Sequence, residues 1–314
     1  MFGSWRRQPA VAAERLGSVL ADVRHARVDG SRLITDVLTG GYRSLSRGHG
    51  IEIAEVREYV EGDDPRHVDW NVTARVGRPF VKRYVEERER TLVFVLDQAS
   101  ALASSFGAWS LRQVAARFCA LFGLLAIGNH DRVGLVAGAG SVERFAPPRR
   151  GVAHVYTILR DVVAEAGGPP AGPRPGLAAL LAHLAARLRR RSVVFVLSDF
   201  LAPLPPRELL VAGRHHDLVA VRLTAQELLA PPPVLLRLQD PAGGPVRLVD
   251  FAAASVRERY LERVQAQRAA TAAALRHAMV DRIDLVVPTV ADMATITRPV
   301  LGWFRRRELR EQRR

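Results

Sequence analysis

The sequence has one cysteine, one lysine and no long uninterrupted apolar run. Because Cys119 has no second cysteine to pair with, an intramolecular disulfide is excluded and a reducing cytoplasm is compatible with the chain. The longest apolar stretch, residues 118–127, is too short to cross a bilayer and predicts a buried helix. The N-terminal residues lack the apolar core and the cleavage site of a secretory signal peptide. We therefore expect a globular, cytoplasmic protein.

Several motifs of catalysis and metal binding are also missing. No Gly-rich phosphate loop follows a predicted strand, and neither an HExxH motif nor a Cys/His ligand cluster occurs. The run His215-His216-Asp217 has no serine in an elbow motif to accompany it, so a solvated loop is the simpler interpretation. These absences favour a binding protein over an enzyme.

Acidic residues are few relative to basic ones, with 46 Lys/Arg against 32 Asp/Glu and a formal net charge of +14. Nearly all the basic residues are arginine, which with abundant Ala, Gly and Pro is typical of a GC-rich genome. The C-terminal arginines would support binding to nucleic acid or to a membrane surface, although a solvated helix end is the simpler interpretation. They are Arg305, Arg306, Arg307, Arg310, Arg313 and Arg314.

Residues 47–90 differ from the rest of the chain because nine Lys/Arg and ten Asp/Glu balance there. Aromatic side chains stand among these charges, which indicates a folded, ion-paired surface rather than a disordered charge run. Alternation predicts strands over 51–59 and 79–85. Between them, Asp64-Pro65 supplies an N-cap and a proline in the first turn of a helix that ends at Gly77.

The simplest interpretation of this segment is a structural clamp. Its arginines would pair with the aspartates of the same segment, and Trp70 would be the apolar anchor. A surface that docks a protein partner fits the same residues, and a catalytic acid/base site is a weaker alternative. The residues concerned are Arg57, Glu58, Tyr59, Gly62, Asp63, Asp64, Arg66, Asp69, Trp70 and Arg75.

From Thr91 onward, apolar strands alternate with helices. Strands are predicted at 92–96, 132–136, 142–145, 193–197, 218–223 and 283–287. Helices are predicted at 110–127, 152–164, 177–190, 206–212, 255–279 and 290–311, and a hairpin joins 235–238 to 245–249. Continuous apolar strands between helices are typical of a parallel sheet covered on both faces, so we predict an open, doubly wound α/β domain.

The predicted organisation has four parts. Residues 1–46 form an N-terminal helical arm and residues 47–90 the charged strand-helix-strand segment, inserted before the first core strand. Residues 91–230 form the α/β domain, which residues 231–314 complete with a hairpin, a long helix, a last strand and a basic helix.

Two predicted strands end in aspartate, at Asp97 and at Asp199. Ligands of doubly wound sheets bind beyond the carboxyl ends of the strands, and carboxylate and hydroxyl oxygens suit magnesium. Hydroxyl groups near these tips come from Ser100, Ser104, Ser105 and Ser198. The alternative is that the aspartates cap the helices that follow them.

The motifs of this chain resemble the signature of a bacterial family known as domain of unknown function fifty-eight. In the charged segment they are Gly48-His49-Gly50-Ile51-Glu52, Arg57-Glu58-Tyr59, Gly62-Asp63-Asp64-Pro65-Arg66, Asp69-Trp70-Asn71 and Ala74-Arg75. Later motifs are Pro147-Pro148-Arg149-Arg150-Gly151, Ser198-Asp199-Phe200, Arg214-His215-His216-Asp217 and Asp240-Pro241. The resemblance implies a von Willebrand factor A-like domain. It also implies a role beside a MoxR-type AAA+ ATPase in a chaperone-like or complex-maturation system.

Domains of this type often hold magnesium through an Asp-x-Ser-x-Ser motif, a threonine from a later loop and a further aspartate. Asp97 and Asp199 match the aspartates, whereas Ala99 and Ala101 replace both serines. The loop that would carry the threonine has no hydroxyl side chain, and Ser100 is one position out of register. We therefore expect a degenerate metal site of Asp97, Ser100 and Asp199, with no cofactor bound.

The leading hypothesis is a protein-binding module whose partner is a MoxR-type ATPase. The alternative from a different class is a phosphoester hydrolase that uses magnesium or manganese. It would rely on Asp97 and Asp199, with Asp63 or Asp64 as further candidates.

Overall fold

The computed structural model divides the chain into two compact units, one formed by residues 1–42 and 91–314 and the other by residues 43–90. The structure describes residues 16–29, 38, 40–42, 52–60, 63–64, 68–85, 90–98, 102, 107–164, 176–239 and 245–312.

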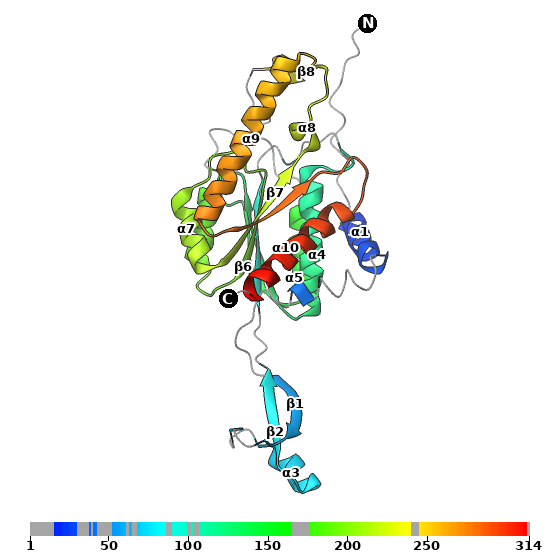
Figure 1. Ribbon diagram of the computed structural model, residues 1–314, viewed down its shortest axis with the longest axis vertical. Coiled ribbons are helices and arrows are strands. Elements are labelled where there is room, and N and C mark those ends of the chain that lie inside the picture. The colour runs from blue at the N-terminus through cyan, green and yellow to red at the C-terminus, as the bar shows by residue number, and fades with distance from the viewer. Residues whose placement is uncertain are drawn as a thin grey trace. The chain divides into compact units, whose positions relative to one another are not determined.

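The larger unit is a mixed α/β fold around a six-stranded sheet (Figure 1). Its strands are β3 (Thr91–Asp97), β4 (Arg132–Gly138), β5 (Arg144–Arg149), β6 (Val193–Ser198), β7 (Asp217–Thr224) and β10 (Asp281–Val286). They lie in the order β10-β7-β6-β3-β4-β5, and every neighbouring pair is parallel except β4 and β5. The predicted α/β class with a mostly parallel sheet is confirmed.

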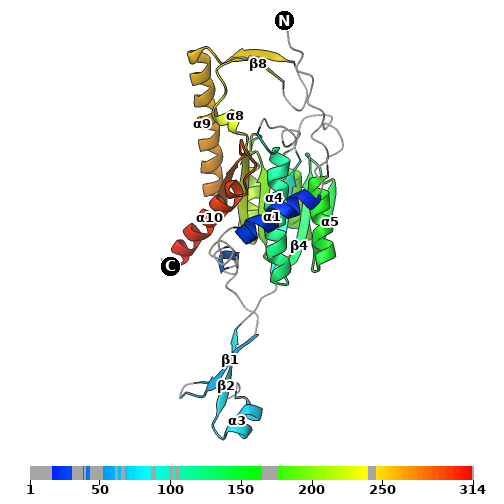
Figure 2. The same cartoon turned by 90° about the vertical axis from the view of Figure 1, so that its right-hand side faces the viewer.

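Helices cover both faces of this sheet (Figures 1 and 2). One face carries α1 (Leu16–Asp29), α4 (Leu111–Gly128), α5 (Val152–Val163) and α10 (Ala294–Gln312). The other face carries α6 (Ala178–Arg187), α7 (Pro206–His215) and α9 (Ala254–His277), whose leucines pack on the valines of β3 and β6. The short helix α8 (Gln226–Leu229) and the antiparallel hairpin of β8 (Leu235–Leu238) and β9 (Arg247–Asp250) precede α9.

Helix α4 is the apolar helix that the sequence predicts to be buried. A full capping box starts it, because Ser110 and Gln113 each accept a hydrogen bond from the backbone N–H of the other. Within the described part of the chain this is the one helix long and apolar enough to cross a membrane, and 78% of it is buried inside the protein. Its Phe118 and Phe122 pack against Phe195 of β6. The predicted core helix is confirmed.

The smaller unit consists of a hairpin and one short helix. β1 (Glu52–Glu58) pairs antiparallel with β2 (Phe80–Val85), and α3 (Trp70–Val76) lies between them in the sequence. The helix ends at Gly77, which has a φ of 74° and so adopts a left-handed conformation that glycine tolerates best. Both predicted strands and the predicted helix end are confirmed.

The predicted start of this helix is wrong. The sequence pattern favours Asp64-Pro65, whereas the observed N-cap is Asp69. Asp69 Oδ1 accepts hydrogen bonds from two backbone N–H groups of the first turn, at 3.1 and 3.3 Å. The backbone N of Asp69 also donates to the carbonyl O of Phe80 at 2.8 Å. This second bond connects the N-cap residue to β2. It favours Asp69 over Asp64 as the N-cap, and local capping preference alone does not show this difference.

Candidate functional site

The strand order of the larger unit reverses at β3, because the chain continues to β4 on one side and later returns to β6 on the other. Ligands of open α/β sheets bind at such a reversal, beyond the carboxyl ends of the strands. Here β3 ends at Asp97 and β6 ends at Ser198. The fold therefore brings the two predicted strand tips together.

The side chains of Asp97 and Ser198 form a direct polar contact at this place. Ser198 Oγ donates a hydrogen bond of 2.8 Å to Asp97 Oδ2, and the two residues are only 1% and 6% exposed. The same Oγ accepts a hydrogen bond of 3.0 Å from the backbone N of Phe200. Phe200 has a φ of 53°, a left-handed conformation that costs a residue with a large side chain free energy. The Ser198 hydroxyl thus fixes a strained turn and links it to β3.

Asp199 lies one position beyond this contact. Its Oδ1 accepts a hydrogen bond of 3.0 Å from the backbone N of Leu201, which is a local loop bond. The register explains the arrangement, since Leu96 pairs with Leu197 and the next position of each strand is Asp97 and Ser198. The sequence pattern indicates Ser198 only as a hydroxyl near the tip. In each of the two apolar strands the run of apolar residues ends at a polar side chain, Asp97 in one and Ser198 in the other. Aligning the strands at these ends could have identified Ser198 as the partner of Asp97.

Among the described residues, the oxygen groups at this tip include the carboxylates of Asp97 and Asp199 and the hydroxyl of Ser198. No group of three or more His, Cys, Asp or Glu side chains is placed to hold a metal ion in the parts of the chain that the structure describes. The oxygens of Asp97 and Ser198 bond to each other, and Ser100, Ala99 and Ala101 lie outside the described residues.

Gln98 is a further polar residue of the tip that the sequence analysis did not single out. Its backbone N donates to the carbonyl O of Gly138 at 2.9 Å, which continues the pairing of β3 with β4. Its side chain is 2% exposed, and neither the amide O nor the amide N has a hydrogen-bond partner among the residues that the structure describes. A buried amide without partners costs about 1–3 kcal/mol, so the buried side chain of Gln98 lowers the stability of the fold.

The single thiol is buried, and two arginines of the basic tail are paired with aspartates of the sheet. Complete burial raises the pKa of Cys119 far above its ordinary value, so the thiol stays protonated. In the tail, Arg307 forms a two-pronged ion pair with Asp217, and Arg310 Nη1 lies 2.8 Å from Asp281 Oδ1. These two arginines therefore fasten α10 to the sheet.

The smaller unit contains part of the predicted ion-pair clamp. Arg57 Nη2 lies 2.7 Å from Asp63 Oδ1, and Asp63 Oδ2 accepts a hydrogen bond of 3.0 Å from the backbone N of Val60. Asp63 thereby connects the side chain of Arg57 to the backbone of Val60. Glu58 pairs with Arg78 on the surface at 3.1 Å, a contact that contributes little because both side chains are exposed.

Other members of the predicted clamp behave differently. Arg75 is exposed and makes no ion pair with any residue that the structure describes, so its predicted pairing is wrong. Tyr59 contributes its backbone N, which donates to the carbonyl O of Pro79 at 2.9 Å. Gly62 and Arg66 lie outside the described residues, and Asp64 is exposed.

Trp70 is not the apolar anchor that the sequence predicts, because 72% of its surface is exposed. It is the first residue of α3, a helix without a buried residue. Val60 and Val76 of the same unit are also more than half exposed, whereas Val81 of β2 is buried. An exposed tryptophan on a folded, highly charged unit is a candidate contact residue for another protein.

Solved structures with low similarity include the conserved hypothetical protein BatB from Bacteroides thetaiotaomicron. It is 8% identical with a TM-score of 0.41, over 69% of this chain and 98% of that one. An aerotolerance-related membrane protein from Bacteroides fragilis is 10% identical with a TM-score of 0.38, over 69% of this chain and 99% of that one.

Sequence comparison identifies closer relatives. Uncharacterized proteins of Mycobacterium bovis and Mycobacterium tuberculosis are each 32% identical over 244 residues, which cover 76% of this chain and 76% of theirs. The family described as "Protein of unknown function DUF58" matches residues 55–270, which include the charged unit from Arg57 onward and both strand tips. The chain belongs to this family.

Proposed function

We propose that this protein is a binding module whose unit at residues 43–90 docks another protein. The observation that carries the proposal is the exposure of Trp70 on α3. Tryptophan is enriched among the residues that dominate binding energy, since its burial removes a large apolar surface from water. The ion pair of Arg57 with Asp63 supports the proposal, because side chains already held in one conformation lose less conformational entropy on binding.

The partner that we propose is a MoxR-type AAA+ ATPase, in a chaperone-like or complex-maturation system. This choice follows from the family resemblance of the motifs around Arg57 and Trp70. The same resemblance leads us to propose that the six-stranded sheet is of the von Willebrand factor A type. The phosphoester hydrolase and the anionic-surface binder remain predictions that no particular contact among the described residues favours.

Co-purification tests this proposal. The tagged full-length chain would be expressed together with a MoxR-type ATPase of the same genome and recovered at several salt concentrations. We expect the ATPase to be retained at low and moderate salt and lost at high salt, because a docking unit rich in charges is sensitive to screening. Recovery of the tagged chain alone under all conditions would contradict the proposal.

A further inference from the structure

The two edges of the six-stranded sheet differ in their ability to accept another strand. β5 forms one edge and contains Pro147 and Pro148, which have no backbone N–H to donate. β10 forms the other edge, contains no proline, and pairs only with β7 among the described strands. An edge strand presents unpaired backbone N–H and C=O groups along its free side. The β10 edge is therefore the one that is chemically open to strand addition.

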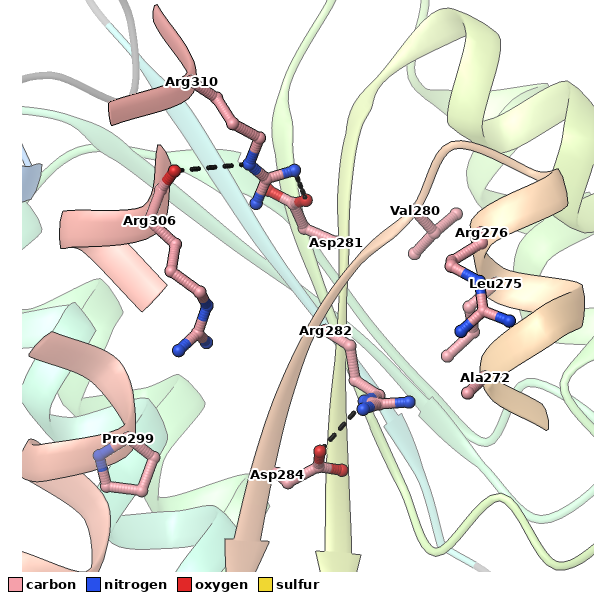
Figure 3. Close-up of a pocket in the computed structure, with 10 residues that line it drawn as sticks. All are labelled: Ala272, Leu275, Arg276, Val280, Asp281, Arg282, Asp284, Pro299, Arg306 and Arg310. Carbon is pink, nitrogen blue, oxygen red and sulfur yellow. Dashed lines mark hydrogen bonds and ion pairs between the residues drawn. The ribbon is translucent and has the colours of Figure 1, made fainter. Parts of the chain in front are cut away.

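A cavity of about 580 Å³ lies along β10 between α9 and α10 (Figure 3). We call it the β10 edge pocket. Its charged lining residues are Arg276, Asp281, Arg282, Asp284, Arg306 and Arg310. Figure 3 shows Arg276 projecting from α9 on one side of β10 and Arg306 projecting from α10 on the other.

The β10 edge pocket has an excess of positive charge. Asp281 is already paired with Arg310 at 2.8 Å, and Asp284 with Arg282 at 2.9 Å. The side chains of Arg276 and Arg306 make no hydrogen bond or ion pair with any described residue. Two guanidinium groups beside the open edge thus lack an acidic partner.

The excess of positive charge extends from the pocket to β7, the strand next to β10. Arg222 of β7 is 4% exposed and donates from Nε to Asp284 Oδ1 at 2.6 Å, so it shares that carboxylate with Arg282. Its Nη1 is buried and has no hydrogen-bond partner within the described ranges. Burial first, and then the positive charges of Arg222 and Arg282, lower the pKa of Arg268 on α9. An acidic group of a bound partner would therefore be stabilised near these arginines.

The arrangement of the arginines fits an extended chain better than a compact anion. α9 and α10 cover opposite faces of the sheet, so Arg276 and Arg306 approach the edge from opposite sides (Figures 1 and 3). Successive side chains of a strand also point to opposite faces. A strand added beside β10 could therefore present one acidic side chain to Arg276 and another, an odd number of positions away, to Arg306.

We propose that the β10 edge pocket binds an extended acidic segment of a partner protein as an additional strand beside β10. Backbone hydrogen bonds to the free edge supply binding that does not depend on sequence, and the arginines select acidic side chains. This site belongs to the larger unit, and it stands whether or not Trp70 docks an ATPase.

Fluorescence anisotropy with the full-length protein tests the proposal. The probe is a labelled synthetic peptide of about eight residues, mostly Val and Thr, with two glutamates an odd number of positions apart. The control peptide differs by one central proline, which cannot donate its backbone N to β10. We expect the probe to bind and the proline peptide to fail. Bound probe should also slow hydrogen exchange of the amides of residues 281–286.

Three protein variants separate the pocket from general charge. Arg276→Gln and Arg306→Gln should each weaken probe binding by up to roughly fivefold, as expected for exposed ion pairs. Arg305→Gln, an exposed arginine outside the pocket, should leave it unchanged.

Four outcomes would overturn the proposal. They are equal binding of both peptides, no probe binding up to about 1 mM, equal weakening by Arg305→Gln, and competition by inorganic phosphate as strong as that of unlabelled probe. The last of these would assign the pocket to a small anion.

Discussion

The Phe195→Ala variant is expected to lose about 3–5 kcal/mol of unfolding free energy, the range for removal of a buried aromatic ring. Phe195 lies in the middle of β6 and is completely buried. Its ring centroid is 4.4 Å from that of Phe122, 5.1 Å from that of Phe118 and 5.9 Å from that of Trp303. One substitution therefore removes contacts from β6, α4 and α10 together, and these elements are too closely packed to close the cavity.

Urea denaturation followed by circular dichroism measures this loss. Phe145→Ala is the matched control, because Phe145 lies on the edge strand β5 and is partly exposed. A Phe195→Ala variant that unfolds within about 1 kcal/mol of wild type would contradict the packing described for β6.

Acid is expected to destabilise the protein through His216. This side chain is almost completely buried, and neither ring nitrogen has a hydrogen-bond partner in the described part of the chain. Burial, and then the charges of His215 and Arg191, lower the pKa of His216 to about 4. In the unfolded chain the same ring takes up a proton near pH 6.5. The contribution of neutral His216 to the unfolding free energy is therefore fully present above about pH 6.5. It is lost as the pH falls toward 4, by roughly 3 kcal/mol in total.

The measurement is the difference in unfolding free energy between wild type and His216→Leu from pH 7 to pH 4. This difference removes the effect of carboxylates, which are common to both proteins. It should shift by roughly 3 kcal/mol in favour of the variant as the pH falls. His277→Gln, at an exposed position on α9, should show no comparable shift. A constant difference between wild type and His216→Leu would contradict the buried, neutral state of His216.

The pattern of apolar residues predicts the strands of the sheet, because a strand buried on both faces is apolar at successive positions. The strands around Phe94 and Phe195 are continuous apolar runs, and the helices between them have clear boundaries. β5 was placed less well, since the prediction ended near Phe145 and the strand continues to Arg149 through two prolines. Prolines normally argue against a strand, but an edge strand tolerates them.

The candidate sites were harder to predict because they depend on contacts between distant residues. The choice of Asp69 over Asp64 depends on a hydrogen bond to Phe80 across the smaller unit. The pairing of Asp97 with Ser198 depends on the register of two strands about one hundred residues apart in the sequence. The sequence predicts Trp70 as the apolar anchor of the clamp. A short helix with no buried residue leaves it exposed instead.

The affinity of the full-length protein for a MoxR-type ATPase, measured for wild type, Trp70→Ala and Leu248→Ala, tests the central claim most directly. Leu248 is the matched control, because it is an exposed apolar residue of the larger unit. Docking through the smaller unit predicts that Trp70→Ala binds about 30-fold more weakly or worse, the loss typical of a dominant tryptophan contact, while Leu248→Ala binds as wild type does. Equal affinities for wild type and Trp70→Ala would contradict the claim.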